Sequence, residues 1–154
     1  MPAWYDILGM DFDRRVDEAG VRRSAGQLAD LIARERERGI PSERIVLAGF
    51  SQGAAMTLHV GLRHPERLAG LMVLSGYLVL GDSLEAEQSP ANQDTPMFFG
   101  HGRQDDVVPV AGGEGAFQRV GADRRARWHP YDMGHELCAA ELRDLTTWLH
   151  QVLK

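Results

Sequence analysis

A serine between two glycines follows a short apolar run in the first half of the chain. Residues 49–53 read Gly-Phe-Ser-Gln-Gly and come directly after the apolar residues 45–48. A strand that ends in Gly-x-Ser-x-Gly and opens a helix is a nucleophile elbow, in which the serine hydroxyl projects from a sharp turn. We expect a Cβ at Gly49 or at Gly53 to collide with the neighbouring chain in so tight a turn. Ser51 is therefore the candidate nucleophile.

An aspartate and a histidine follow later, each after another apolar run. Asp105 lies in the segment 100–109, and His135 lies in the segment 131–136. An imidazole titrates near neutrality, so it can take the proton of a serine hydroxyl and return it to a leaving group. A buried carboxylate can hold the ring in the required tautomer and stabilise the imidazolium. We predict that His135 is the base and that Asp105 orients it.

Neighbouring residues leave alternatives open. Asp106 is the second candidate for the carboxylate. Cys138, the single cysteine, lies three residues after His135 and is a further candidate nucleophile. Ser51 could also serve only to cap a helix, with the two glycines shaping the turn.

The remaining histidines are expected to have structural roles, whereas two roles stay open for the first aromatic residues. His101 begins the segment that bears Asp105 and is expected to hold that segment in place. Trp4 and Tyr5 could line an acyl pocket or pack in the core. No metal site is predicted because the histidines lack ligand spacing. Four of them are expected at exposed or strand-side positions: His59, His64, His129 and His150.

Hydrophobic spacing predicts four strands that alternate with helices. The expected strands are residues 45–48, 68–74, 97–99 and 127–131, and the last is placed near an edge because it is partly polar. This alternation predicts an α/β fold with a parallel sheet. Catalytic groups of such sheets collect at the carboxyl ends of strands, and the chain order Ser, Asp, His is that of α/β-hydrolases.

Helical spacing predicts the connecting elements. A loop from Asp11 is expected to lead into a long helix that stops at Gly39, with one stripe of Val16, Ala25, Leu28, Leu31 and Ile32. A second helix follows Ser51, residues 81–96 are expected to form a polar loop, and residues 112–120 a weak helix or loop. The last helix is expected to bury a stripe of Leu142, Leu145, Leu149 and Val152, with Trp148 beside it.

Composition limits the class of protein. The 154 residues suit a single domain over 1–154, and 44% hydrophobic with 25% charged residues is ordinary for a globular protein. A net charge of −5 argues against nucleic acid and anionic membranes as partners. No apolar run is long enough to span a membrane. One cysteine excludes an intrachain disulfide, and together with the absence of a signal-peptide pattern it favours the cytoplasm.

These motifs resemble those of the bacterial carboxylesterase and acyl-protein thioesterase family, also called the phospholipase/carboxylesterase family. The likeness lies in residues 48–53, 101–109 and 134–135, with further likeness in residues 3–6 and 41–45, and it extends over essentially all 154 residues. It implies that this chain hydrolyses carboxylic esters or thioesters without a cofactor.

The resemblance also implies a role for each site residue. Ser51 corresponds to the nucleophile, Asp105 to the acid of the triad and His135 to the base. The backbone N–H of Gln52 corresponds to one donor of the oxyanion hole.

Members of that family normally carry further strands before the Trp-Tyr-Asp segment. The first of these strands ends in a His-Gly-x-Gly loop that supplies a second oxyanion donor, and nothing like it precedes Met1. The resemblance thus implies an N-terminally truncated sheet of about four strands. Losing one donor typically lowers turnover by about 10²–10³. Residues 45–48 would form an apolar edge strand, so we expect a homo-oligomer, most simply a two-fold dimer.

Two functions from different classes follow. The first is a serine carboxylesterase that acts on short-chain esters or thioesters through an acyl-enzyme. The second is a catalytically weak or inactive hydrolase fragment that acts as a self-associating structural module. A related lactone hydrolase would often carry cysteine in the elbow, so Ser51 argues against that class.

Overall fold

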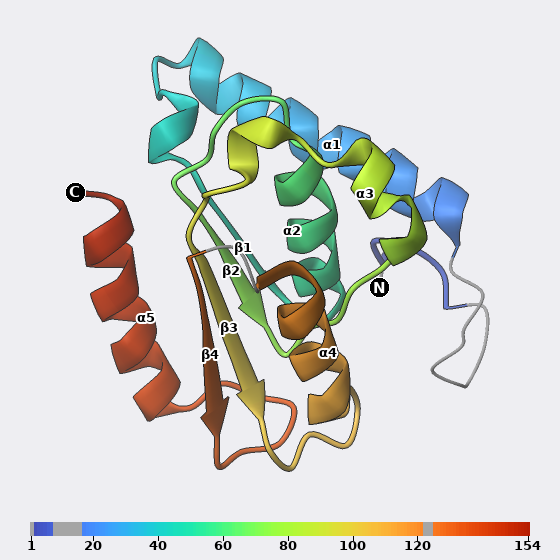
Figure 1. The fold of residues 1–154 in the computed structure, drawn as a ribbon, viewed down its shortest axis with the longest axis vertical. Helices are drawn as coiled ribbons and strands as arrows, with labels where there is room; N and C mark the ends of the chain where they lie inside the picture. The colour runs from blue at the N-terminus through green and yellow to red at the C-terminus, as the bar shows by residue number, and fades with distance from the viewer. Residues whose placement is uncertain (1, 8–16, 122–124) are drawn as a thin grey trace.

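The described residues of the chain form one sheet of four parallel strands in the order β1-β2-β3-β4. The computed structural model describes residues 2–7, 17–121 and 125–154. The strands are β1 (Val46–Phe50), β2 (Gly70–Leu74), β3 (Met97–Gly102) and β4 (Ala126–Tyr131). Helices flank the sheet on both faces (Figure 1). The predicted α/β class with a parallel sheet is therefore confirmed, and β4 lies at an edge as expected.

The register of the strands brings their carboxyl ends together. Phe50 pairs with Leu74, and Leu74 pairs with Gly100. The backbone continues this alignment beyond the strands, because the Ser51 N–H donates to the Leu74 carbonyl at 2.9 Å and the Ser75 N–H donates to the Gly100 carbonyl at 2.8 Å. Residues that follow different strands thus meet at one end of the sheet.

In the described part of the chain, five helices connect or cover the strands. They are α1 (Glu18–Glu37), α2 (Gln52–Arg63), α3 (Leu84–Glu87), α4 (Val110–Gly121) and α5 (Ala139–Val152). Short 3-10 turns, η1 (Ser42–Arg44), η2 (Gly81–Ser83) and η3 (Pro90–Asn92), complete the connections. Helices α2 and α4 pack on one face of the sheet with α1 outside α2, and α5 packs on the other face against β3 and β4 (Figure 1).

Each face of the sheet has its own apolar core. The larger core includes six residues of α2, and this helix is buried from Ala54 to Leu62 because it is enclosed between the sheet and α1. A helix that is covered on several sides is apolar around most of its circumference. The smaller core lies under α5 and consists of Met72, Leu74, Phe98, Leu145 and Trp148.

The buried residues of the long first helix α1 differ in detail from the predicted apolar stripe. It begins after Asp17, whose carboxylate accepts the Gly20 N–H at 3.0 Å. Val21 and Ile32 are buried as part of the inner stripe, whereas Leu31 is exposed. Leu31 lies at the margin of that stripe, where α2 does not cover it. The predicted loop from Asp11 and the position of Val16 fall outside the described residues.

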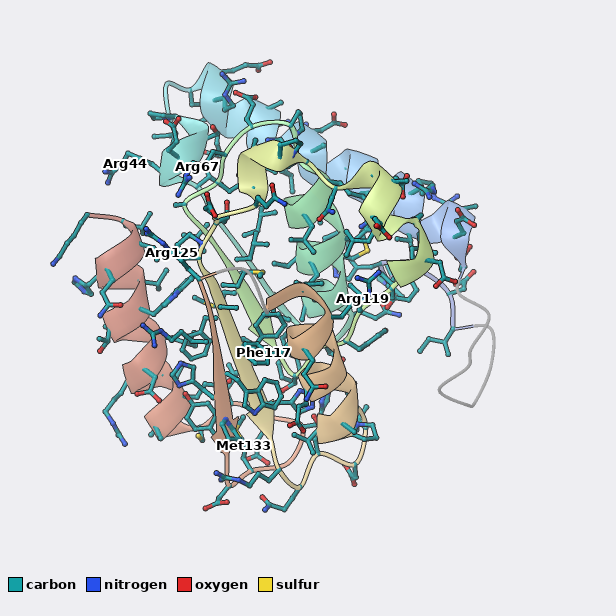
Figure 2. All side chains as sticks on the ribbon, viewed as in Figure 1. Arg44, Arg67, Phe117, Arg119, Arg125 and Met133 are labelled. Carbon is teal, nitrogen blue, oxygen red and sulfur yellow. The ribbon has the colours of Figure 1, made fainter. Side chains whose placement is uncertain are left out.

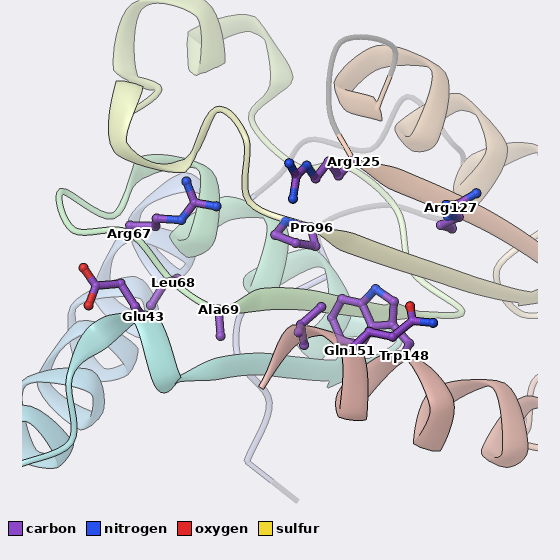
Figure 3. Close-up of a pocket in the computed structure, with 10 residues that line it drawn as sticks. Glu43, Arg67, Leu68, Ala69, Pro96, Arg125, Arg127, Trp148 and Gln151 are labelled. Atoms are coloured by element: carbon purple, nitrogen blue, oxygen red, sulfur yellow. The ribbon is translucent and has the colours of Figure 1, made fainter. Parts of the chain in front are cut away.

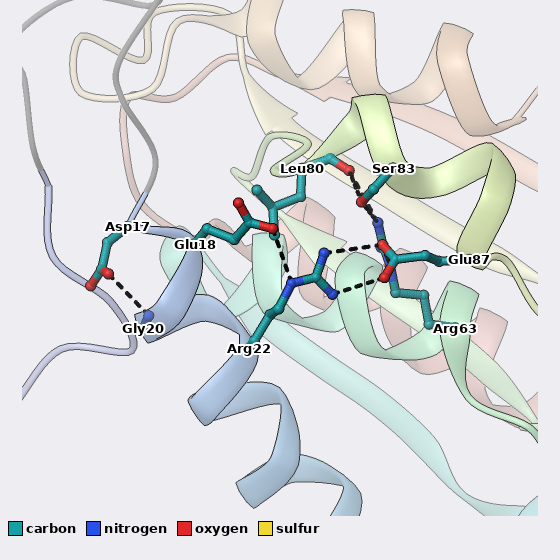
Figure 4. A network of polar contacts seen from close by, with 8 residues as sticks. All are labelled: Asp17, Glu18, Gly20, Arg22, Arg63, Leu80, Ser83 and Glu87. Atoms are coloured by element: carbon teal, nitrogen blue, oxygen red, sulfur yellow. Dashed lines mark hydrogen bonds and ion pairs between the residues drawn. The ribbon is translucent and has the colours of Figure 1, made fainter.

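The segment between β2 and β3 is more regular than the predicted polar loop, since it contains η2, α3 and η3. Figure 4 shows how α3 is attached to α1 and α2. Arg22 donates to both oxygens of Glu87, at 2.8 and 3.3 Å, and Arg63 donates to the same carboxylate at 3.2 Å. Hydrogen bonds from Arg22 and Ser83 lower the pKa of Glu87 to about 2.

Two of the structural histidines are more enclosed than predicted. His59 on α2 and His64 just after it are buried, because the segment with α3 covers that side of α2. Burial lowers the pKa of His59 to about 4, and the nearby charges of Arg63 and Arg22 act in the same direction. His59 is therefore neutral at physiological pH.

The elbow strand β1 is an edge strand of the described sheet, with β2 on one side only. Its residues are half-buried or exposed, whereas every residue of β2 is buried. None of the helices in the described part of the chain has the length and apolar character that a bilayer crossing requires.

Candidate active site

Ser51 occupies a strained turn between a strand and a helix. It is the single residue between β1 and α2, with φ 59° and ψ −118°. A non-glycine residue at positive φ typically costs about 1–3 kcal/mol and persists only where its surroundings hold it. Here the Ser51 N–H bonds to Leu74, and the Ser51 carbonyl accepts the N–H groups of Ala54 and Ala55 at 3.1 and 3.2 Å. The backbone around the candidate nucleophile is thus held on both sides.

The two glycines of the elbow have different reasons to be there. A Cβ at Gly49 would overlap the Gly53 carbonyl, so glycine is required at Gly49 as predicted. A Cβ at Gly53 would meet only Trp4 Nε1, at an ordinary contact distance of 3.7 Å. The predicted collision at Gly53 is therefore wrong, because that position faces the N-terminal segment at ordinary contact distance.

His135 links the serine to a carboxylate. Its Nε2 lies 3.1 Å from Ser51 Oγ, and its Nδ1 lies 2.8 Å from Asp105 Oδ2. These partners indicate the tautomer in which Nδ1–H donates to Asp105 and the bare Nε2 accepts the Ser51 hydroxyl. The His135 side chain remains 16% exposed, so a substrate can reach it.

Asp105 is held in its ionised form by its hydrogen bonds. The side chain is fully buried, and its Oδ1 accepts the N–H groups of Val107 and Val108 at 2.9 and 2.8 Å. Burial acts to raise the pKa of Asp105, but the hydrogen bonds from His135, Val108 and Val107 outweigh it and the pKa is lowered. A buried carboxylate of this kind can orient an imidazole and balance its charge.

A close backbone approach joins the two loops that carry Asp105 and His135. A Cβ at Gly102 would overlap the carbonyls of Met133 and Gly134. The Arg103 N–H donates to the Tyr131 carbonyl at 2.8 Å, and the loops continue side by side from there. Gly102 was not singled out from the sequence, although a glycine at the end of a buried strand signals such an approach.

His101 holds the Asp105 loop, as expected. It is buried, and its Nε2 lies 2.8 Å from the Val108 carbonyl. Its ring lies so close to Gly113 on α4 that a Cβ there would overlap it. The loop that carries Asp105 is thus packed between its own histidine and a helix.

Two side chains of the elbow have contacts that the sequence did not reveal. The Phe50 ring lies against the His135 ring, with centroids 4.7 Å apart. The Gln52 side chain accepts the Trp4 N–H at 3.2 Å and donates to the Tyr5 carbonyl at 3.0 Å. Gln52 therefore ties the N-terminal segment to the first residue of α2, whose backbone N–H has no partner within the helix.

The alternative candidates lie apart from this constellation. Asp106 is exposed, and among the described contacts only Asp105 reaches His135. Cys138 is half-buried at the start of α5 with no recorded contact to Ser51 or His135. Tyr5 is buried and its hydroxyl bonds to that of Tyr77. Within residues 2–7, 17–121 and 125–154, acidic, histidine and cysteine side chains do not gather into a group that could hold a metal ion.

The sequence matches the family described as Phospholipase/Carboxylesterase over residues 1–153. The chain belongs to this family. Its members are hydrolases of carboxylic esters, and this enzyme class therefore applies to the chain. The bacterial branch named in the sequence resemblance stays a prediction.

Individual relatives agree with the family. Acyl-protein thioesterase 1 of Yarrowia lipolytica is 35% identical over 159 residues, which cover 100% of this chain and 70% of that protein. Acyl-protein thioesterase 1 of Schizosaccharomyces pombe is 45% identical over 109 residues, which cover 71% of this chain and 49% of that protein. The crystal structure of Arabidopsis thaliana SOBER1 matches with a TM-score of 0.89 at 26% identity, covering 99% of this chain and 74% of that one.

Proposed function

We propose that the chain is a serine carboxylesterase that hydrolyses short-chain carboxylic esters or thioesters. The observation that carries this proposal is the continuous set of contacts from Ser51 Oγ to His135 at 3.1 Å and from His135 to Asp105 at 2.8 Å. A serine is a weak nucleophile unless an adjacent base takes its proton, and this arrangement supplies the base and its orienting carboxylate. Ser51 is the nucleophile, His135 the general base and Asp105 the acid of the triad.

The first half of the reaction acylates the serine. Ser51 Oγ attacks the substrate carbonyl carbon while its proton passes to His135 Nε2. The negative oxygen of the tetrahedral intermediate accepts the backbone N–H of Gln52. The intermediate collapses, the bond to the alcohol or thiol breaks, and His135 gives its proton to that leaving group. Asp105 remains ionised throughout and stabilises the imidazolium.

The second half releases the acid. A water molecule gives a proton to His135 Nε2 and attacks the carbonyl carbon of the acyl-enzyme. A second tetrahedral intermediate forms, and its collapse returns the proton to Ser51 Oγ and frees a carboxylic acid. The names of the fungal relatives support thioesters as substrates beside oxygen esters.

A second candidate function is a self-associating module that retains the hydrolase sheet without turnover. The edge position of β1 supports it, because the described sheet leaves one side of that strand without a neighbouring strand. We propose in either case a two-fold dimer formed across β1. A single species with the mass of a monomer in sedimentation at micromolar concentration would rule the dimer out.

A cytoplasmic location stays a prediction that rests on the single cysteine.

Hydrolysis of a short-chain p-nitrophenyl ester, measured beside Ser51→Ala, tests the catalytic proposal. We expect turnover that disappears in Ser51→Ala, and a fluorophosphonate that labels Ser51 in the unmodified protein. Thr146→Ala on the exposed face of α5 is the control and retains full activity. Equal background rates in all proteins together with no labelling of Ser51 would favour the non-catalytic module.

A further inference from the structure

A cavity of about 320 Å³ lies at the end of the sheet where the strands begin. Its lining comes from η1, the approach to β2, the residue before β3, the start of β4 and the last turns of α5 (Figure 3). In Figure 2 this end of the molecule is marked by the labels of Arg44, Arg67 and Arg125. The opposite end, with the loops of the candidate active site, is marked by Met133. The cavity is thus separate from the catalytic constellation.

The apolar part of the cavity wall is firmly packed. Leu68 is fully buried, and Ala69 and Trp148 are nearly so. A Cβ at Gly70 would lie 2.6 Å from the Trp148 ring, so the glycine allows the indole to press against the start of β2. Pro96 completes this wall from the loop before β3. The apolar part of the cavity wall is therefore held in place by its packing in the core.

The polar part of the wall is dominated by arginines. Arg67, Arg125 and Arg127 line the cavity, and Glu43 is the one carboxylate among its lining residues. In Figure 3 the Arg125 side chain is drawn next to Pro96, Arg67 lies farther away toward Glu43, and Arg127 lies farther along β4. None of the three guanidinium groups forms an ion pair with another described residue.

This charge contrasts with the rest of the chain. The net charge of the protein is −5, yet three positive side chains face one negative side chain around the cavity. Elsewhere in the described chain, five arginines form ion pairs with carboxylates: Arg22, Arg36, Arg38, Arg63 and Arg103. The cavity therefore offers unpaired guanidinium groups beside a rigid apolar surface.

We propose that this cavity binds a small organic anion in which a phosphate or carboxylate group is attached to a flat apolar body. Guanidinium groups bind both of these anions through paired, charge-assisted hydrogen bonds. The Trp148 and Pro96 side of the wall receives the apolar body, and Glu43 disfavours a second negative group at its side of the cavity. A volume of about 320 Å³ is at the lower end of pockets that hold small molecules.

Occupancy of this cavity does not block the candidate active site. The cavity lies at the amino ends of the strands, and Ser51 follows a carboxyl end. A five-residue strand at about 3.3 Å per residue separates the two by roughly 16 Å. The proposal is independent of the proposed hydrolase activity, because it uses none of the triad residues.

Phenyl phosphate and benzoate are the probes for the two anionic groups, and benzyl alcohol is the neutral control. We expect isothermal titration calorimetry with the full chain to detect binding of at least one anion, weakened by added salt, and no binding of benzyl alcohol. The two anions then distinguish phosphate from carboxylate recognition. No binding of either anion at millimolar concentration would overturn the proposal.

Two tryptophans report where the probe binds. Trp148 lies in the cavity wall, whereas Trp4 lies beside Gly53 of the elbow. In ¹H–¹⁵N spectra, assigned with Trp148→Phe and Trp4→Phe, the bound anion is expected to shift the Trp148 indole signal and leave that of Trp4 in place. A shift of the Trp4 signal alone would place the anion at the elbow and overturn the proposal.

Substitution of the arginines tests their part. Arg67→Gln and Arg125→Gln are each expected to weaken anion binding about tenfold, as the loss of one charge-assisted interaction does. Both side chains are exposed, so the variants are expected to fold, and circular dichroism checks this. Arg143→Gln, on the exposed face of α5 outside the cavity, is the matched control and leaves binding unchanged. Unchanged binding in both cavity variants would refute the assignment.

Discussion

Among the residues that the structure describes, two carboxyl groups are buried, Asp105 in the candidate active site and Glu141 on α5, and they differ in their partners. Asp105 is fully buried and its two oxygens accept hydrogen bonds from His135 and two backbone amides. Glu141 on α5 is equally buried, yet neither of its oxygens has a well-formed hydrogen bond with another described group. It lies directly over Gly100, where a Cβ would overlap it.

The comparison of Asp105 with Glu141 indicates that hydrogen bonds, more than burial, decide whether a buried carboxyl is charged. The pKa of Asp105 is lowered despite its burial. Burial raises the pKa of Glu141 to about 7; the Cys138 amide opposes this and the charge of Asp144 adds to it. One group is an anion ready to pair with an imidazolium, and the other holds its proton up to neutral pH.

The largest expected effect is on kcat and comes from removing the charge of the Asp105 carboxylate. Asp105→Asn should lower kcat for a p-nitrophenyl ester by about 10⁴, because a neutral amide favours the wrong tautomer of His135 and leaves the imidazolium without a counter-charge. Asp106→Asn is the adjacent control and should retain the activity of the unmodified protein, since its side chain is exposed. Equal losses in both variants would contradict the assignment.

The protonation of Glu141 is tested by the pH dependence of stability. The pKa of Glu141 is about 7 in the folded chain, against an ordinary value of 4.5. The folded state therefore keeps a proton that the unfolded state has lost between these values, and the free energy of unfolding falls as pH rises from 4.5 through 7, by up to about 3 kcal/mol. The stabilisation is complete below pH 4.5, where both states are protonated.

Glu141→Gln should remove most of this pH dependence, because an amide stays neutral at every pH. Urea unfolding at about pH 5 and about pH 8 measures it: the variant should lose less stability over this interval than the unmodified protein. Glu114→Gln, an exposed position on α4, should leave the pH dependence as it was. A steep dependence that survives in Glu141→Gln would assign it to another group.

Two glycines of β3 separate the roles of the two carboxyls. Gly102→Ala should push apart the loops that carry Asp105 and His135, and a displacement of about 1 Å can cost about 10² in kcat. Gly100→Ala should instead press on Glu141, so it should destabilise the fold by about 1–3 kcal/mol and leave kcat of the folded protein little changed. Ester hydrolysis and urea unfolding of both variants make the comparison, and a larger loss of kcat in Gly100→Ala would reverse it.

The smallest effect concerns the charge beside Glu141. Asp144 accepts the Tyr131 hydroxyl at 2.7 Å and raises the pKa of Glu141 less than burial does. Asp144→Asn keeps an acceptor for Tyr131 but removes the charge, so the pH at which stability is lost should move down slightly. The change in unfolding free energy should stay below about 1 kcal/mol. A complete loss of the pH dependence would show that charge, and not burial, dominates.

Much of the candidate site was accessible from the sequence because its signals are local. The turn at Ser51 needs a strand before it, a helix after it and a glycine at position 49, and the residues that specify all three lie in one short segment of the sequence. The chain order of serine, aspartate and histidine after successive strands also follows from the alternation of elements. Asp105 was predicted ahead of Asp106, but local signals left Asp106 open as an alternative, because the directions of adjacent side chains in a loop are set only when the loop is folded.

The sequence by itself determined the four strands and the long helices between them, since local periodicity and turn residues specify them, whereas the short helix α3 lies in a segment that was expected to be a loop. Only the tertiary structure decided how α5 is rotated: it buries Glu141, Leu145 and Trp148, whereas Leu142 of the predicted stripe is 51% exposed. A helical repeat sets the spacing between residues but not the direction that its face takes. That direction is set here by the space above Gly70 and Gly100, into which the Trp148 ring and the Glu141 carboxyl fit.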